Sequence, residues 1–242
     1  MRLRLISCEV LFREMCAACA HSPHQVDVEF LPKGLHDLGG KPMAAEIQAV
    51  VDRTPEGLYD AILLGYGLCG NGLDGLRARH TRLVLPKAHD CIGILMGGRE
   101  RYQVYFDANP GTYYRSTGWL ERGKGLKQLT HNTMGFDESL EAMVEKYGED
   151  DGRYLYEELT RYRSQYSKLT FIETGLEAGG EFVDEAAAEA KEHGWKFERL
   201  AGELGWLRRL VDGEWSESEF AIAEPGQTLA ASYDTAVVRA EG

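Results

Sequence analysis

The sequence lacks an apolar run long enough to cross a bilayer, and it lacks an excess of basic residues. No apolar stretch approaches the roughly 20 residues that a membrane-spanning helix needs. The 242 residues include 39 acidic and 27 basic side chains, and this acidic balance repels phosphate backbones and anionic lipids. The chain starts directly with strand-like sequence, without the apolar stretch of a secretion signal. We therefore expect a soluble, cytoplasmic protein that binds neither nucleic acid nor membranes.

The sequence also lacks the compact motifs that usually identify a cofactor or a zinc finger. The five cysteines are odd in number, and their spacing matches no zinc-finger pattern. In a reducing compartment such cysteines are free, metal-bound or catalytic rather than paired in disulfides. The stretch GYGLCG has glycines at the spacing G-x-G-x-x-G, but no long helix is expected directly after it, so support for phosphate binding there is weak.

Segments typical of strands and of helices alternate along most of the chain. We expect strands at residues 2–7, 26–31, 61–65, 82–85, 169–172, 196–200 and 220–223. We expect helices at residues 10–20, 43–51, 92–96, 138–147, 153–166, 182–193 and 205–211. This alternation predicts an α/β fold with a doubly wound, mostly parallel sheet in two α/β halves joined by an aromatic insert and helices.

The predicted elements divide the chain into three parts. Residues 1–98 form an N-terminal α/β half with the candidate site, residues 99–166 an aromatic insert with a pair of helices, and residues 167–242 a C-terminal α/β half. Residues 99–135 combine many tyrosines with many glycines, which favours a long irregular segment, with a short hairpin, over the site. Within it, Tyr113 and Tyr114 are candidate catalytic or lid residues, and an aromatic mini-core is the alternative.

Three cysteines follow predicted strands at the point where each strand ends. Cys8, Cys69 and Cys91 follow the first, third and fourth strands, and ligands bind at this end of the strands in doubly wound sheets. Three thiolates from separate loops suit a catalytic zinc ion with one open position, and His89 is an alternative ligand or a hydrogen-bond donor to a thiolate. The competing interpretation is that each cysteine is a small buried hydrophobic residue.

Other residues at these strand ends are weaker candidates. The turn around Cys69 offers four candidate cofactor-binding residues, Gly67, Gly70, Asn71 and Gly72. Glu173 follows a later strand and is a candidate catalytic carboxylate, with a loop or capping role as the alternative. Cys91 is also a candidate nucleophile beside His89 or Asp90. Cys16 and Cys19 form C-A-A-C on one apolar helix face, which favours core packing over a redox motif.

Several stretches together resemble a bacterial and archaeal family, the domain of unknown function numbered sixteen thirty-eight. They are ISCEV, GYGLCGNGL, LPKAHDCIGILMGGRERY, PGTYYRSTGW and LVDGEWSESEFAIAEPG. The family is associated with corrinoid methyl-transfer systems. The resemblance therefore implies a zinc-dependent demethylase or methyltransferase that moves a methyl group between a small methylated substrate and cobalamin, with Cys8, Cys69 and Cys91 at the family's cysteine positions.

This chemistry is workable on general grounds. A Lewis-acidic zinc ion bound to the leaving nitrogen or oxygen stabilises the charge that develops there, and zinc binds imidazole-type nitrogens readily. An N-methylated heteroaromatic compound or amine, or an O-methyl compound, is thus the expected substrate. The sequence has no D-x-H-x-x-G-like corrinoid-ligating signature, so cobalamin would enter free or on a partner corrinoid protein, and a corrinoid-reactivating protein is another expected partner. The alternatives are a non-catalytic carrier of a metal or metallocofactor and an enzyme with a cysteine nucleophile.

Overall fold

The protein has an α/β fold, in which mostly parallel sheets are covered by helices. The structure is a computed structural model that describes residues 1–122, 140–160, 165–232, 234 and 236–242. These residues form a five-stranded sheet, a three-stranded sheet and a two-stranded ribbon. These sheets and the helices between their strands confirm the α/β class predicted from the sequence. Of the helices within these ranges, none has the length and apolar character required to span a membrane.

The five-stranded sheet is the centre of the larger core. Its strands lie in the order β2 (Gln25–Leu31), β1 (Arg2–Cys8), β3 (Ala61–Gly65), β4 (Leu83–Pro86) and β8 (Phe220–Ala223). The first four are parallel, and β8 runs antiparallel to β4. Every residue of β3 and β4 is buried, as expected of central parallel strands covered on both faces. The order 2-1-3-4 is that of a doubly wound sheet whose switch point lies between β1 and β3.

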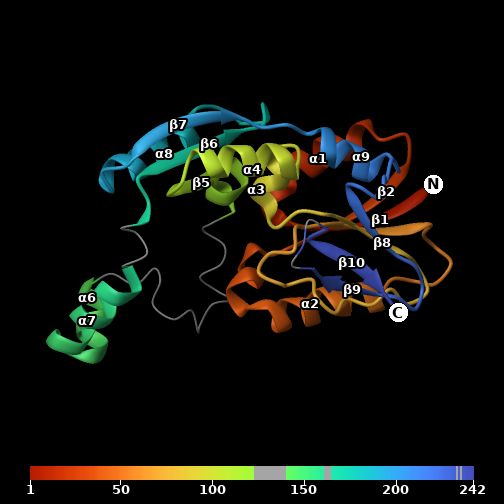
Figure 1. The fold of residues 1–242 in the computed structure, drawn as a ribbon, viewed down its shortest axis with the longest axis horizontal. Coiled ribbons are helices and arrows are strands. Elements are labelled where there is room, and N and C mark those ends of the chain that lie inside the picture. The colour runs from red at the N-terminus through yellow and green to blue at the C-terminus, as the bar shows by residue number, and fades with distance from the viewer. Residues whose placement is uncertain (123–139, 161–164, 233, 235) are drawn as a thin grey trace.

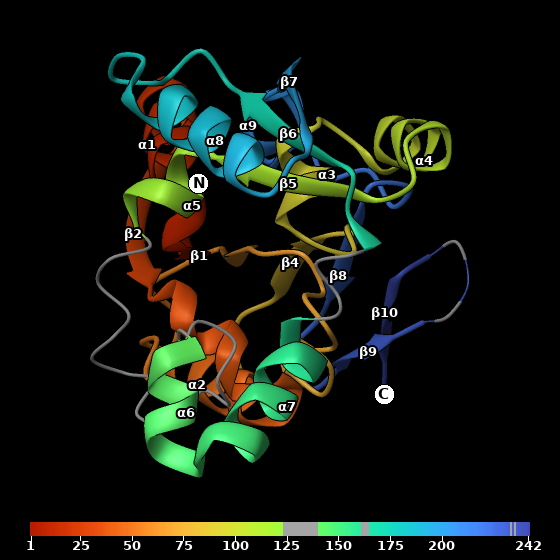
Figure 2. The same ribbon diagram turned by 90° about the vertical axis from the view of Figure 1, so that its left-hand side faces the viewer.

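Helices cover both faces of this sheet (Figures 1 and 2). The helices α1 (Phe12–His21) and α9 (Gly205–Val211) lie on one face, and α2 (Gly40–Asp52) lies on the other. The ribbon of β9 (Thr228–Ala231) and β10 (Val238–Glu241) lies on the same side as α2. Buried apolar residues from all these elements, such as Leu5, Ile47 and Leu207, form one continuous core.

The three-stranded sheet is entirely parallel, in the order β5 (Thr112–Ser116), β6 (Lys168–Glu173) and β7 (Lys196–Ala201). Residues Leu169 and Phe171 of β6 are buried against helix α8 (Glu181–Glu192) in a second, smaller core. Because side chains alternate along a strand, the residues between them face the opposite side of the sheet. That side is covered by helix α4 (Arg99–Ala108).

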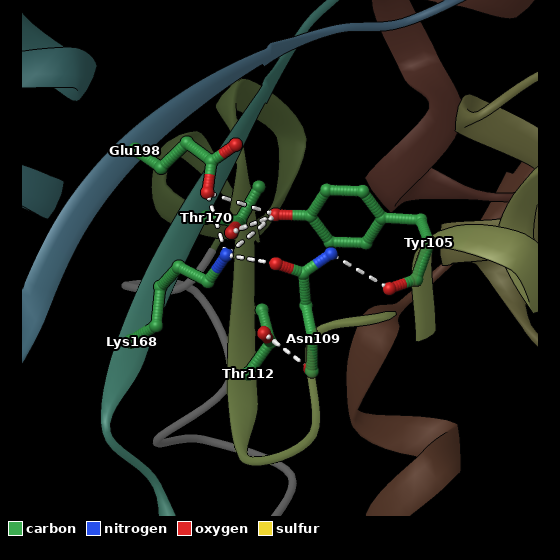
Figure 3. Close-up of polar contacts among 6 residues, drawn as sticks. All are labelled: Tyr105, Asn109, Thr112, Lys168, Thr170 and Glu198. Atoms are coloured by element: carbon green, nitrogen blue, oxygen red, sulfur yellow. Dashed lines mark hydrogen bonds and ion pairs between the residues drawn. The ribbon is translucent and has the colours of Figure 1, made fainter. Parts of the chain in front are cut away.

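A network of polar side chains fixes α4 to the three-stranded sheet (Figure 3). The Lys168 ammonium group donates to Asn109 Oδ1 at 2.5 Å and to Glu198 Oε2 at 2.7 Å. The hydroxyl group of Tyr105 lies 2.8 Å from Thr170 Oγ1 and donates to the same Glu198 oxygen at 3.1 Å. Because the network joins α4 to β6 and β7 and satisfies its own donors and acceptors, we interpret it as structural.

One expectation about the middle of the chain needs correction. Residues 99–121 are not irregular, because they form α4, β5 and α5 (Thr117–Glu121). The mixture of tyrosines and glycines in this segment is typical of loops, which is why a loop was expected. However, Tyr102 and Tyr105 are three residues apart, a helical spacing, and both contact Tyr114 from one face of α4. Residues 123–139 lie outside the described residues, so the rest of the expected segment is not tested. The predicted pair of helices is present as α6 (Leu140–Tyr147) and α7 (Glu149–Thr160).

The sheets do not follow the three parts into which the sequence was divided. Strand β5 belongs to the predicted insert, yet it pairs with β6 of the predicted C-terminal half. Strand β8 belongs to that C-terminal half, yet it pairs with β4 of the N-terminal half. The domain boundaries themselves stay a prediction. The strands β9 and β10 were not predicted, because four-residue strands with the sequences TLAA and VRAE carry a weak signal.

Helix α1 carries a buried carboxyl group that should make stability depend on pH. The side chain of Glu14 is 1% exposed, and Thr174 Oγ1 donates to its Oε1 at 2.8 Å, whereas no described residue hydrogen-bonds its Oε2. Burial is the main cause that raises the pKa of Glu14 above its ordinary value of 4.5. The folded state therefore holds this proton to higher pH than the unfolded state does, and stability falls as pH rises between the two pKa values.

We expect a Glu14→Gln variant to lose this part of the pH dependence. Glutamine keeps an oxygen for Thr174 but has no charge, so at neutral pH the variant should be more stable by the order of 1 kcal/mol. Urea unfolding at a series of pH values measures the difference from the wild type. Glu46→Gln on the exposed face of α2 is the control and should leave the curve unchanged. Equal slopes for wild type and Glu14→Gln above pH 4.5 would contradict the interpretation.

Candidate functional site

Three loops at the switch point of the five-stranded sheet bring the predicted cysteines together. Cys8 is the last residue of β1 and is 2% exposed. Cys69 lies in the loop after β3, and Cys91 is the first residue of helix α3 (Cys91–Leu95), which follows β4. All three strands are parallel, so their ends lie at the same edge of the sheet. We call this group of Cys8, Cys69 and Cys91 the thiol site.

Backbone hydrogen bonds hold the Cys69 loop against the Cys91 loop. The amide of Leu68 donates to the carbonyl of Ala88, and that of Cys69 to the carbonyl of His89, both at 2.8 Å. Gly67 permits this approach, because a Cβ there would lie 2.6 Å from the Cα of Asp90. The Asp90 carboxylate in turn accepts from the amides of the first turn of α3 and so fixes the start of that helix.

The Cys69 loop has an unusual backbone conformation. Cys69, Gly70 and Asn71 all have positive φ angles, of 49°, 64° and 66°. A positive φ is uncommon for cysteine, and such strained residues are frequent at binding and catalytic sites. Of the predicted cofactor-binding residues, Gly67 and Gly72 are buried, whereas Gly70 and Asn71 are exposed on this loop beside the start of α2.

The thiols lie near enough to affect one another electrostatically. Burial raises the pKa of Cys8 to about 12, and it also raises the pKa values of Cys69 and Cys91. After burial, the next cause at Cys69 is the charge of Cys8, and at Cys91 it is the charge of Cys69. No disulfide joins them. Burial thus opposes the thiolate form of Cys91, which a nucleophile and a metal ligand both require.

His36 is a member of this neighbourhood that sequence reasoning missed. Its Nε2 lies 3.6 Å from the sulfur of Cys8, and burial is the main cause that lowers its pKa, with a smaller contribution from Lys33. His36 belongs to η2 (Lys33–Leu38), which follows β2, and the last residue of β2 pairs with Cys8. Applying the strand-end argument to the second strand would have found it. The side chain of His89, by contrast, is exposed.

Trp119 is a second missed residue. Its indole N–H donates to the sulfur of Cys91 at 3.3 Å, and its backbone carbonyl accepts from the ammonium group of Lys33 at 3.3 Å. The same ammonium nitrogen lies 4.7 Å from the centre of the Trp119 ring. Helix α5 supplies Trp119, so its position depends on how β5 packs against the larger sheet. No local sequence pattern reports that packing.

Tyr66 places a buried hydroxyl group near the thiols. The side chain is 1% exposed, and its oxygen has no hydrogen-bond partner among the described residues. Burial, followed by the charges of Cys8 and Cys69, raises the pKa of this hydroxyl group. A buried donor without an acceptor is costly, so a ligand at the thiol site would find a hydrogen-bonding group there.

A small aromatic hollow lies beside the thiol site. Its volume is about 210 Å³, and its lining is mostly aromatic. The predicted candidates Tyr113 and Tyr114 both line it, as do Trp119 and Tyr166. Tyr113 also contacts Trp195, and Tyr114 contacts Tyr102 and Tyr105, so both tyrosines have packing roles too. Trp119 connects the hollow to Cys91.

The remaining candidates lie elsewhere. Glu173 ends β6 in the three-stranded sheet, and its carboxylate accepts from Arg199 of the neighbouring strand at 2.5 Å. Cys16 is exposed on α1, which corrects the expectation of core packing, because the helix turns it away from the sheet. Cys19 is half-buried, and burial raises its pKa to about 11.

The donor chemistry of the thiol site fits a soft divalent cation. Thiols and imidazole are the preferred ligands of zinc. Among the described residues no positive side chain stabilises the thiolates of Cys69 and Cys91, a role that a bound cation would fill. Across the described residues, however, no three His, Cys, Asp or Glu side chains are already arranged as a metal-binding group. The fit therefore rests on the donors and on their shared location.

Residues 30–211 match the model of a family described as a protein of unknown function, DUF1638. The chain belongs to this family. No curated protein and no solved structure matches the chain. The DUF1638 match includes His36, Cys69, Cys91 and Trp119, whereas Cys8 precedes it, so the assignment of Cys8 rests on the geometry alone.

Proposed function

We propose that this DUF1638 protein is a zinc-dependent methyltransferase that exchanges a methyl group between a small methylated substrate and cobalamin. The observation that carries the proposal is the convergence of three thiol loops at the switch point of a doubly wound sheet, where ligands of such sheets bind. Cys8, Cys69 and Cys91 would hold the ion. Bound zinc would act as a Lewis acid on the heteroatom that loses or gains the methyl group.

The surrounding side chains suit thiolate ligands. Burial raises the pKa of Cys8, and the charge of the Lys33 ammonium group offsets a small part of that rise in favour of the thiolate. The Trp119 indole donates a hydrogen bond to the Cys91 sulfur, which favours the thiolate and fixes its orientation. The Tyr66 hydroxyl group is a donor for either a thiolate or the polar atom of a substrate.

The aromatic hollow supports an N-methylated substrate. Tyr114 and Tyr166 provide aromatic surfaces against which a small methylated group can pack. The rings of Tyr113 and Trp119 already hold the cations of Arg115 and Lys33, so the hollow suits a neutral methylated amine or azole rather than a quaternary ammonium group. A volume of about 210 Å³ suits a small amine or azole but is far too small for a corrinoid. Cobalamin supplies the methyl acceptor or donor in this proposal. It would be presented at the edge of the site, free or by a partner corrinoid protein.

Metal analysis followed by a cobalamin assay tests the proposal. The purified protein should contain about one zinc ion per chain. With Co(I)-cobalamin and trimethylamine or N-methylimidazole, it should produce the absorption spectrum of methylcobalamin, and zinc-depleted protein should not. A protein that contains zinc but gives no methyl transfer with any N- or O-methyl compound would retain the metal site and refute the activity.

A non-catalytic metal carrier is the second candidate, and one observation favours it. His36 near Cys8 offers a fourth donor, which would close the coordination shell around the metal. Cobalt substitution separates the two functions. An open site should change its visible spectrum when imidazole is added, whereas a site closed by His36 should respond only in the His36→Ala variant.

A further inference from the structure

A second cavity lies at the same edge of the five-stranded sheet, beyond β4. Its volume is about 470 Å³. The wall combines Lys87 after β4, the start of α4, Trp206 of α9, and Ser218 and Glu219 before β8. None of the three thiol-site cysteines lines it. Helix α3 links the two places, because it begins at Cys91 and is followed by Gly97 and Gly98 of the cavity wall.

The charges on the wall leave a positive excess. Glu203 pairs with Arg101 at 2.8 Å, and Glu219 pairs with Arg209 at 2.6 Å, so both carboxylates are neutralised. Lys87 donates to the backbone carbonyl of Glu217 and has no acidic partner among the described residues.

Besides Lys87, the cavity wall has two more charged residues, Arg99 and Glu100. Neither Arg99 nor Glu100 has an ion-pair partner within the part of the chain that the structure describes. Two cations, Lys87 and Arg99, therefore face one anion, and the cavity has room for a negatively charged group.

The start of α4 adds backbone donors. This ten-residue helix begins at Arg99, and its N-cap residue, Gly98, has no side chain to cap it. The first amides of a helix lack acceptors within the helix and carry a partial positive charge, which favours an anion. The network of Lys168, Tyr105 and Glu198 holds the rest of α4 on the three-stranded sheet, so this end is fixed relative to the cavity (Figure 3).

Trp206 provides the independent indication of a ligand. Its side chain is 2% exposed, and its indole N–H has no hydrogen-bond acceptor among the described residues. Buried donors are nearly always satisfied, so an unpaired donor in a cavity wall calls for an acceptor from a molecule inside. The indole of Trp215, by comparison, donates to the carbonyl of Leu210 at 2.7 Å.

We propose that this cavity binds a small molecule through an oxyanion group, a carboxylate or a phosphate. Arg99 and Lys87 supply the charge, the first amides of α4 supply directed donors, and the Trp206 indole donates to a further acceptor on the same ligand. The site is distinct from the thiol site, and it does not depend on a metal.

Calorimetric titration of the 242-residue protein with inorganic phosphate, and separately with acetate, tests this proposal at constant ionic strength set with chloride. At least one of the two anions should bind saturably at one site, and the stronger binder identifies the ligand's anionic group. Arg99→Gln should weaken binding by at least about tenfold, because a charge-assisted hydrogen bond is lost. Arg208→Gln, an exposed arginine of α9 outside the cavity wall, should bind as the wild type does.

Two tryptophan variants separate a ligand-binding role from a structural one. Trp206→Phe removes an unpaired donor, so it should weaken anion binding and affect thermal stability less than Trp215→Phe, which breaks an existing hydrogen bond. Saturable binding that survives both Arg99→Gln and Trp206→Phe would overturn the proposal. The absence of saturable binding of either anion to the wild type would overturn it as well.

Discussion

Purified Cys69→Ala and Cys91→Ala proteins should contain almost no zinc, against about one ion per chain in the wild type. Each substitution removes one of three thiolates, and the remaining two donors bind zinc at least about 100-fold more weakly. Both variants should remain folded, because alanine is a small apolar residue that fits at the half-buried position of Cys69 and at the buried position of Cys91. Metal analysis and circular dichroism of the same preparations measure both outcomes.

Cys16→Ala is the matched control for these variants. Cys16 is a free, exposed cysteine on α1, and the variant should retain the full zinc content. Zinc at the wild-type level in both Cys69→Ala and Cys91→Ala would refute the assignment of the thiol site as a metal site. Loss of zinc in Cys16→Ala as well would point to non-specific binding by thiols.

A Gly118→Ala variant should be less stable by about 3 kcal/mol or more, although alanine is normally the better residue in a helix. Gly118 lies in α5 against the turn after β1. A Cβ there would overlap the carbonyl oxygen of Val10 and would lie 2.7 Å from its carbonyl carbon. Both neighbours are backbone atoms, so no side-chain rotation can relieve the overlap. Chemical denaturation measures the loss.

Gly93→Ala is the control for this substitution. Gly93 also lies in a short buried helix, but a Cβ there would only reach Tyr102 at 3.7 Å, an ordinary contact. This variant should be as stable as the wild type or slightly more stable. Because Trp119 follows Gly118, the Gly118→Ala protein should also lose the contact between the indole and Cys91, which tryptophan fluorescence reports. Equal stability of the two alanine variants would contradict the packing.

The sequence predicted the elements that depend on local pattern. Runs such as residues 61–65 are apolar on both faces, and only a central strand buries both faces. The ends of such strands then predict a common edge, and the loops of Cys8, Cys69 and Cys91 do meet there. This part of the site followed from the parallel order of the strands alone.

The residues that were missed depend on packing between distant elements. Trp119 reaches Cys91 only because β5 pairs with β6, which places α5 against the turn after β1. Trp206 and Lys87 share a cavity only because α9 and β8 return to the first sheet. A hydrophobic pattern reports which face of an element is buried, but not which partner covers it.

The pairing of β4 with β8 has a consequence for how the chain folds during synthesis. Leu83 pairs with Ala223, so about 140 residues must be made before the outer side of β4 is covered. Until then, a fully apolar strand has an unpaired edge that can pair with another chain. Ribosome-bound nascent chains that end before β8 should therefore need chaperones to stay unaggregated, and the loops of the thiol site should become rigid only after β8 has been synthesised.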